Sequence, residues 1–180
     1  MAREYISDLS TKGIERLQKE ITKYQKDLEK SLDTAIKDLA KLGKKVAIQE
    51  GSKFSKNLVK GNVTYKKIKK YEYSVETTNP LLTLLECGTG LVGEQSGSKT
   101  AQILGYQYRI GSKIRVYTLH FNGQKGEYEG WFYYDKKLGK VRFTQGIPSR
   151  PFFSNTASFL HQVAPKYVAE KVRYLMNDNN

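Results

Sequence analysis

Acid–base chemistry could be assembled from His120, Glu127 and Glu129, which lie within ten positions of one another. Imidazole and carboxylate groups serve as general acids and bases when a protein holds them together, and a small basic ribonuclease-type enzyme would need such a set. No other residue in the sequence fixes a third partner, and a histidine at the end of a strand is usually just part-exposed. We therefore expect no catalytic residues and no enzymatic activity.

A glycine-rich segment, Gly88-Thr89-Gly90-Leu91-Val92-Gly93, matches the spacing of a dinucleotide-binding loop. That chemistry requires a strand before the loop, a helix N-terminus after it and an acidic residue about 20 positions further on. Here an apolar helical turn precedes the glycines and a polar loop follows them. In Gly97-Ser98-Lys99-Thr100 an intervening serine displaces the lysine that a phosphate-binding loop needs. We expect no nucleotide cofactor.

The single cysteine, Cys87, excludes an internal disulfide framework, and with only two histidines in the chain the residues fall short of a zinc-finger pattern. Cys87 lies within an apolar turn, where a small core residue is expected rather than a nucleophile. The first six residues contain no apolar stretch of the signal-peptide kind, and the longest apolar run, 81–92, includes Glu86. The sequence predicts a soluble, intracellular-type chain with no metal, no cofactor and no membrane partner.

Positive charge is concentrated in one part of the chain. The 180 residues contain 31 Lys and Arg against 18 Asp and Glu, a net charge of +13, and residues 44–70 supply +8 of it from nine lysines and Glu50. Charge runs are usually solvated loops, but such a surface also suits a polyanion or an acidic protein. The lysines are Lys44, Lys45, Lys53, Lys56, Lys60, Lys66, Lys67, Lys69 and Lys70.

A long amphipathic helix is predicted over residues 12–42. Apolar residues recur there in steps of three or four from Ile14 to Val46, with charged residues between them, and Gly43 is a plausible stop. Such a helix would be about 46 Å long, whereas a compact domain of this size is about 40 Å across. The helix must therefore bend, or part of its apolar stripe must pack against another subunit.

The middle of the chain predicts antiparallel strands, and its end predicts a helix. Strand patterns cover 71–76, 106–110, 114–121, 130–134 and 140–144, with turns at Asn122-Gly123 and Lys137-Leu138-Gly139. A capped helical turn is expected at 81–87, a polar loop that is mobile when free at 94–100, and a closing helix at 150–176 that Pro165 kinks or divides. The sequence thus predicts a single α+β domain over residues 1–180, with the long N-terminal helix and the C-terminal helix packed on one face of an antiparallel β-sheet spanning 71–144.

Aromatic residues are frequent in the predicted sheet. Thirteen of the 21 lie between Tyr65 and Phe143. Aromatic side chains interleaved with lysines can stack on bases, but tyrosine-rich sheets are also typical of protein interfaces, because the ring buries a large area at little entropic cost. No spacing of a known nucleic-acid-binding sheet is present, so we favour interface and core.

Three stretches of the sequence together resemble a known family. They are residues 73–90, ending in Glu86-Cys87-Gly88-Thr89-Gly90; residues 130–143, with Gly130-Trp131-Phe132-Tyr133-Tyr134-Asp135 and Lys140-Val141-Arg142-Phe143; and residues 144–157, with Thr144-Gln145-Gly146-Ile147-Pro148-Ser149-Arg150-Pro151-Phe152-Phe153. They are similar to the GTG segment and to the T-x-G-x-x-A-x-PF signature of the gene-product-ten-like minor tail proteins of HK-ninety-seven-type phages, a family of tail-completion or neck proteins. The resemblance covers residues 10–176, and its third stretch is the most specific.

The resemblance implies a structural role without catalytic residues. Such proteins form a ring, usually six-fold, at the head-proximal end of the tail, where they join the tail terminator or tube to the head connector, with DNA passing through the bore where a head exists. It implies a homohexamer located in the virion and assembled in the bacterial host cytoplasm. The motif positions it points to are Glu86, Gly88, Thr89, Gly90, Gly146, Arg150, Pro151, Phe152 and Phe153.

Residues 44–70 are expected to form an extended arm or hairpin that docks on a neighbouring protein, with some lysines facing the bore. Apolar residues such as Phe54, Leu58 and Ile68 alternate with the lysines, which a purely solvated segment would not need. The alternative function is that of a basic protein that binds nucleic acid without sequence specificity. The lysines assigned to the partner-facing or DNA-facing arm are Lys53, Lys56, Lys60, Lys66, Lys67, Lys69 and Lys70.

Overall fold

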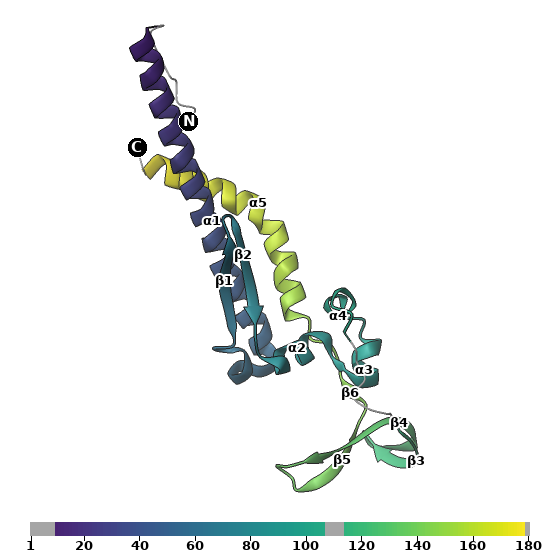
Figure 1. The fold of residues 1–180 in the computed structure, drawn as a ribbon. Coiled ribbons are helices and arrows are strands. Elements are labelled where there is room, and N and C mark those ends of the chain that lie inside the picture. Colours follow the sequence, from purple (N-terminus) through teal and green to yellow (C-terminus); the bar gives the residue numbers. More distant parts are fainter. Residues whose placement is uncertain (1–9, 107–113, 179–180) are drawn as a thin grey trace. The chain divides into compact units, whose positions relative to one another are not determined.

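The computed structural model describes residues 10–106 and 114–178, and the α+β class predicted from the sequence is confirmed (Figure 1). The helices are α1 (Thr11–Val59), α2 (Pro80–Cys87), α3 (Gly90–Gln95), α4 (Lys99–Ile103) and α5 (Phe152–Asp178). The strands are β1 (Val63–Lys69), β2 (Glu72–Thr77), β3 (Ile114–Phe121), β4 (Gln124–Asp135), β5 (Lys140–Thr144) and β6 (Gly146–Ile147). Contacts group the chain into two compact units, each of which takes part of α1 and part of α5.

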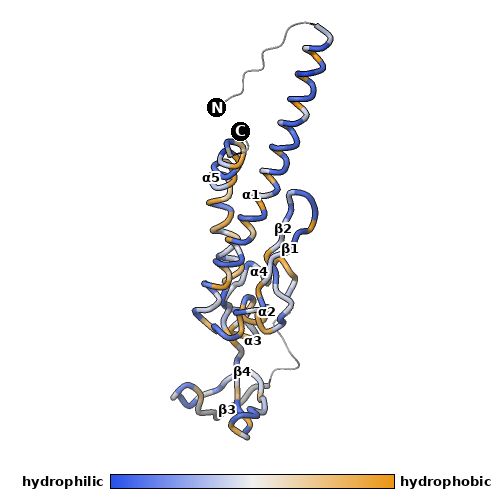
Figure 2. Tube along the Cα trace, turned by 90° about the vertical axis from the view of Figure 1, so that its left-hand side faces the viewer, coloured by the Kyte–Doolittle hydropathy of each residue, from blue (hydrophilic) through white to orange (hydrophobic). Residues whose placement is uncertain are grey.

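The long N-terminal helix is confirmed, but the prediction that it stops at Gly43 is wrong. Helix α1 continues to Val59, with non-helical backbone angles at Ser55, and alternates polar and apolar residues along its length (Figure 2). Gly43 serves close packing instead, because a Cβ added there would lie 2.7 Å from a Leu160 methyl and 3.1 Å from Val75. Residues 44–59 are therefore helical, and the extended arm predicted for 44–70 is wrong in that part.

The first unit consists of α1 up to Gly43, residues 65–75 and α5 from Leu160 onward. Ala35 and Ala40 are buried on α1, and the Ser31 hydroxyl lies 3.5 Å from the Met176 sulfur of α5. Strands β1 and β2 form a two-stranded sheet beside α1, and the turn between them places Tyr71 at a φ of 63°. This confirms the half-buried strand predicted at 71–76 and a hairpin for the last part of the basic segment.

The second unit comprises Lys44–Thr64 and Glu76–Phe159. Its largest fully buried side chains are Phe152, Leu82, Val59, Val63 and Cys87. Cys87 is therefore a core residue, as predicted. Helix α2 has the predicted signals: its first N–H groups are capped by the Asn79 side chain, which accepts from Leu81 at 3.0 Å, and Gly88 ends it at a φ of 80°.

The polar loop predicted at 94–100 is wrong, because most of that segment is helical. Residues 90–95 form α3 and residues 99–103 form α4, so three residues lie between the two helices. The segment is helical because Ser98 caps α4 and also binds the backbone of α2. The Ser98 hydroxyl is buried and accepts from Ala101 N–H at 3.2 Å, as a helix N-cap does, and it donates to the Glu86 carbonyl at 3.3 Å.

The strands lie in two small sheets rather than in the single sheet predicted. Besides the β1–β2 pair, β3, β4 and β5 form an antiparallel sheet with β4 in the centre. Its two turns confirm the predictions: Asn122 and Gly123 have φ of 50° and 80°, and Gly139 has 61°. The strand predicted at 106–110 falls, apart from Tyr106, outside the described residues. Helix α5 runs through Pro165 as one element.

Candidate functional site

The carboxylate of Glu86 is the centre of a buried polar cluster in the second unit. One oxygen, Oε1, accepts from the Thr100 hydroxyl at 2.7 Å and from Ser154 N–H at 3.0 Å, and Oε2 accepts from Phe153 N–H at 2.8 Å. Two of these donors are backbone N–H groups of the first turn of α5, which lack partners within the helix. A carboxylate there is also favoured by the positive end of the helix dipole.

The backbone around Glu86 is tied to the segment that leads into α5. The Glu86 carbonyl accepts from the Ser149 hydroxyl at 2.6 Å, and Arg150 N–H donates to the Leu85 carbonyl at 2.7 Å. Arg150 also places its guanidinium 5.2 Å from the centre of the Phe54 ring. Helix α2 is thereby joined to the chain just before α5.

The glycines of the GTG segment permit a close backbone crossing. Thr89 pairs with Ile147 and Gly90 with Gly146 in an antiparallel bridge, and Ile147 N–H donates to the Thr89 hydroxyl at 3.0 Å. A Cβ on Gly146 would collide with the Thr89 carbonyl, and one on Gly90 would lie 2.6 Å from the Gln145 oxygen. Both glycines have positive φ, which other residues adopt at a cost.

The structure therefore brings together all nine motif positions singled out in the sequence. Gly88 crosses near Ser149, and Pro151 directly precedes α5, where its carbonyl accepts from Asn155 N–H. Phe152 and Phe153 begin α5, with Phe152 buried and its ring 4.5 Å from that of Phe153. These residues come from two segments about 60 positions apart, 86–90 and 146–153. Their contacts are capping, backbone pairing and packing, so the cluster joins segments of the chain.

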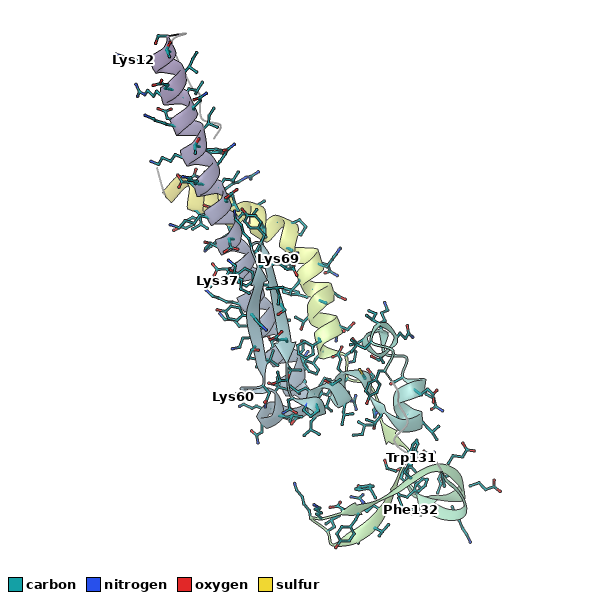
Figure 3. All side chains as sticks on the ribbon, viewed as in Figure 1. Lys12, Lys37, Lys60, Lys69, Trp131 and Phe132 are labelled. Atoms are coloured by element: carbon teal, nitrogen blue, oxygen red, sulfur yellow. The ribbon has the colours of Figure 1, made fainter. Side chains whose placement is uncertain are left out.

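A shallow cleft of about 260 Å³ adjoins this cluster. Its lining combines Thr89, Gly90, Thr144 and Gly146 with Trp131, Phe132 and Tyr133 of β4, two of which are labelled in Figure 3. The indole N–H of Trp131 is buried and has no hydrogen-bond partner within the described residues. Beyond the cleft, the sheet exposes Tyr134 and Val141. An open aromatic surface of this kind is typical of protein interfaces.

The basic segment is partly neutralised by the protein itself. Lys53 pairs with Glu50 at 2.6 Å and Lys69 with Glu72 at 3.0 Å, while Lys67 and Lys70 pair with acids of α1. The remaining three predicted arm lysines are exposed and make no ion pair within residues 10–106 and 114–178: Lys56, Lys60 and Lys66.

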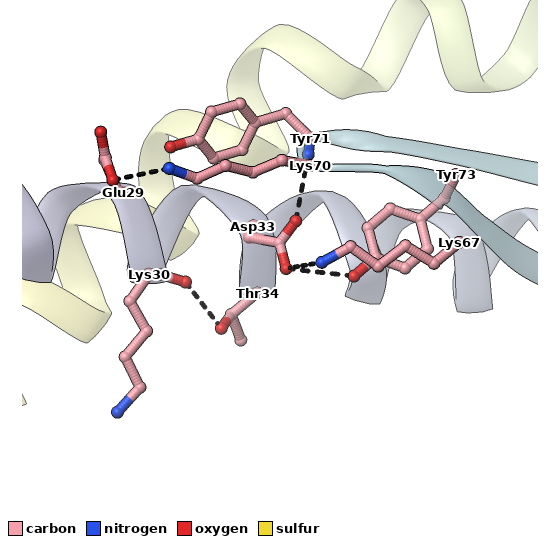
Figure 4. A network of polar contacts seen from close by, with 8 residues as sticks. All are labelled: Glu29, Lys30, Asp33, Thr34, Lys67, Lys70, Tyr71 and Tyr73. Carbon is pink, nitrogen blue, oxygen red and sulfur yellow. Dashed lines mark hydrogen bonds and ion pairs between the residues drawn. The ribbon is translucent and has the colours of Figure 1, made fainter.

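The hairpin docks on α1 through a network centred on Asp33 (Figure 4). The Asp33 carboxylate accepts from Lys67 Nζ at 2.7 Å, from Tyr71 N–H at 3.1 Å and from the Tyr73 hydroxyl at 3.2 Å, and Lys70 lies 2.6 Å from Glu29. The hydrogen bond with Lys67 is the main cause that lowers the pKa of Asp33. The hydrogen bond with Glu29, followed by that with Tyr71, raises the pKa of Lys70 to about 12.

This network shows that the hairpin part of the basic segment binds its own chain. The ammonium groups of Lys67 and Lys70 are paired with Asp33 and Glu29, and the prediction that these lysines face a neighbouring protein or DNA stays a prediction. Lysine and acid are 34 and 41 positions apart, so no local pattern identifies the pairs. Thr100, Ser149 and Ser154, the partners of Glu86, were missed for the same reason.

The three residues considered for acid–base chemistry lie on β3 and β4. The strand register places His120 opposite Lys125 and Glu129 opposite Arg115, so His120 and Glu129 are not a cross-strand pair. The side chain of His120 is outside the described part of the chain. The absence of enzymatic activity stays a prediction.

Comparisons of the chain with family models, with curated proteins and with solved structures find no match. Within the described residues, no helix has both the length and the apolar character needed to cross a bilayer. The same residues contain no group of three or more His, Cys, Asp or Glu side chains placed to hold a metal ion.

Proposed function

We propose that the protein is a structural, non-enzymatic component of a phage or phage-like tail. It forms a ring, six-fold in the assembled particle, at the head-proximal end of the tail, and joins the tail to the tail terminator or the head connector. The protein is located in the virion and assembles in the cytoplasm of the bacterial host. The basis of the proposal is the resemblance of the three sequence stretches.

One structural observation supports this proposal more than any other. The motif residues 86–90 and 146–153 meet in one cluster in which each has a structural task, from the Glu86 cap on α5 to the crossing of Gly90 and Gly146. Motifs that carry chemistry would be expected to present a reactive group in a cleft. The cleft that adjoins this cluster is lined by aromatic rings, glycines and threonines, which suits the docking of a neighbouring protein.

The test is to delete the coding sequence from the genome that produces the particle and to image what assembles. We expect filled heads and tails that remain unjoined, or tails without a completed upper end, with rescue by the wild-type gene. A reconstruction of the rescued particle should show six copies in one ring. Normal numbers of joined particles without the gene, or a ring of one or twelve copies, would contradict the proposal.

A second candidate function, non-specific binding of nucleic acid, is favoured by one observation. Lys56, Lys60 and Lys66 are exposed and lack an ion pair in the described part of the chain. Phosphate contacts need only such cations and no precise geometry. If these lysines lie along a bore, the protein would have both functions. Particles assembled without DNA distinguish the two functions. If the protein is incorporated only when DNA is present, nucleic-acid binding is its primary function.

A further inference from the structure

The N-terminal part of α1 carries an apolar stripe whose isoleucine and leucine side chains are exposed in the described part of the chain. Ile14, Ile21 and Leu28 are 47%, 40% and 38% exposed, whereas Ala35, one heptad further along the same helix face, is fully buried. Figures 1 and 2 both show α1 continuing beyond the C-terminal end of α5 and beyond the β1–β2 turn, all within the first unit. The packing that covers Ala35 therefore ends before Leu28.

The stripe follows a strict seven-residue repeat. Counting Ile14 as position a places Ile21, Leu28 and Ala35 at a, and Leu17, Tyr24 and Ser31 at d. Ser31 is buried and contacts Met176 of α5. The same seam thus has two parts. Ser31 contacts α5, whereas Ile14, Ile21 and Leu28 continue the same repeat with exposed side chains and with no facing helix among the described residues. A periodic apolar seam that continues an established helix–helix contact has the geometry to pack against another helix.

We propose that residues 14–28 of α1 pack, in parallel and in register, against the same residues of a second copy of this chain. The side chains beside the seam favour this occupant. Positions g hold Glu20 and Asp27, and positions e hold Gln18 and Gln25. In a parallel, in-register pair each g residue faces the e residue of the next heptad, so that Glu20 meets the amide of Gln25.

The competing arrangements are disfavoured by the same flanks. An antiparallel pair would set g against g, bringing the acids Glu20 and Asp27 of the two copies together. An acidic partner helix would meet the same two carboxylates. A parallel arrangement is also the one that copies related by rotation about an axis along the helix adopt.

The contact should be weak in free solution and stronger in an assembly. Two heptads span about 21 Å, and their contact is smaller than the roughly 1,200–2,000 Å² of a stable interface. The inference rests on the proposed ring in one respect, namely that neighbouring copies raise the effective concentration of the seam. A solution of the free protein at a few hundred micromolar provides a comparably high concentration of the seam without any other tail component.

The test is cysteine cross-linking in the full-length protein. The native Cys87 is fully buried, so the wild type serves as the blank. Ile14→Cys places a thiol at one end of the seam, where a parallel copy brings it to its own counterpart and an antiparallel copy brings it to position 28. Lys19→Cys, on the outer face of the same helix, is the matched control. We expect a short bis-maleimide to link Ile14→Cys at least tenfold more efficiently than Lys19→Cys.

Other outcomes would overturn the inference. Efficient linking of Ile14→Cys only when it is mixed with Leu28→Cys would show an antiparallel pair. Protection of Ile14→Cys from alkylation in a protein that sediments as a monomer would show that the chain covers its own seam. Equal linking of Ile14→Cys and Lys19→Cys would show no specific contact. As a second measurement, Ile21→Asn should weaken self-association at least tenfold in sedimentation, while Lys19→Asn leaves it unchanged.

The two proposals fail separately. Cross-linking of Ile14→Cys in free protein, combined with normal head–tail joining after gene deletion, would leave the seam contact standing and remove the tail function. Unjoined particles after deletion, with no specific cross-link in either the free protein or the particle, would leave the tail function standing and remove the seam contact.

Discussion

At the scale of single residues, Glu86 is buried and accepts three hydrogen bonds, so its substitution should destabilise the fold. Glu86→Gln keeps the shape but replaces one acceptor oxygen by an NH₂ group that faces a donor, either Phe153 N–H or the Thr100 and Ser154 donors. A buried group left unpaired in this way costs about 1–3 kcal/mol.

We therefore expect Glu86→Gln to lower the free energy of unfolding by about 2 kcal/mol, measured by urea denaturation. The matched control is Glu94→Gln, a change of the same type at an exposed site of α3, which should stay within about 0.5 kcal/mol of the wild type. Equal stability of the two variants would show that the Glu86 hydrogen bonds contribute nothing net.

Two glycines with nearly the same backbone conformation provide a second test. Gly90 and Gly97 have φ of 62° and 63°. A Cβ on Gly90 would lie 2.6 Å from the Gln145 oxygen and 2.7 Å from Trp131, whereas a Cβ on Gly97 would meet nothing within 4 Å. Gly97→Ala should cost only the left-handed strain, about 1–2 kcal/mol.

Gly90→Ala should cost about 1–3 kcal/mol more than Gly97→Ala in the same denaturation experiment, because overpacking is added to the strain. The difference between the two alanine variants isolates the close crossing of residues 89–90 with 146–147 from the backbone term. If both variants lose the same stability, the crossing is loose enough to accept a methyl group.

At the scale of elements, the docking of the hairpin on α1 should depend on pH. The pKa of Asp33 is lowered from its ordinary 3.8 mainly by the Lys67 hydrogen bond. A carboxylate with a lower pKa in the folded state stabilises the fold above its unfolded pKa, and this contribution is lost as the pH falls through the folded pKa. The window therefore lies below pH 3.8.

Between pH 6 and pH 2, Asp33→Asn should flatten the decline of the urea midpoint that the wild type shows at its acid end. The control, Asp27→Asn, removes an aspartate of the same helix that makes no ion pair in the described residues, and its profile should follow the wild type. Parallel profiles for all three proteins would mean that the Asp33–Lys67 pair does not act on stability.

The elements that could be predicted from the sequence are those defined by local signals. Asn79 and Pro80 begin α2, Gly88 ends it, and Asn122-Gly123 forms a hairpin turn, because a cap or a turn needs only its own few residues. Gly43 misled because a glycine in a long helix signals either an end or a close neighbour, and the neighbour, Leu160, is distant in sequence. The division of the strands into two sheets depends on pairing, which no local pattern encodes.

The candidate site was predictable in part of its membership and not in its geometry. Glu86 and Phe153 were both identified from motifs, yet nothing in the sequence states that the carboxylate of one caps the helix begun by the other, 67 positions away. Asp33 and Glu29 were not identified at all, because acids in an amphipathic helix are ordinarily solvated and their lysine partners lie in another element.

At the scale of the whole molecule, neither compact unit is a continuous piece of chain. The first is assembled from three stretches and the second from two, with α1 and α5 contributing to both. Removing either end of the chain therefore takes residues from the first unit and interrupts a helix shared with the second.

The positive charge of the protein leads to a prediction for the salt dependence of DNA binding. If Lys56, Lys60 and Lys66 contact phosphates, replacing all three by Gln should reduce the slope of log K against log salt by up to about 2.7, since each phosphate contact contributes about 0.9. Binding to random duplex DNA, followed by fluorescence anisotropy from 50 to 300 mM salt (roughly the range over which such contacts weaken), measures this slope.

The matched control replaces Lys12, Lys19 and Lys23 of α1 by Gln, which lowers the net charge of +13 by the same three units. If Lys56, Lys60 and Lys66 are the residues that contact the phosphates, the slope of log K against log salt should be unchanged in this control. Equal reductions in the two triple variants would show that DNA responds only to overall charge and that the exposed lysines form no specific site.

The Asn122-Gly123 turn is a site at which the asparagine should deamidate slowly as the protein ages. Because Gly123 has no side chain, its own backbone nitrogen is unhindered and can attack the side-chain amide carbon of Asn122, from which ammonia leaves. Water then opens the resulting cyclic imide to give aspartate or isoaspartate. Both products add one negative charge to a chain of net charge +13, and isoaspartate also inserts a methylene into a turn whose φ values are 50° and 80°. Aged protein should therefore separate from fresh protein on cation exchange, with the change confined to the tip that joins β3 and β4.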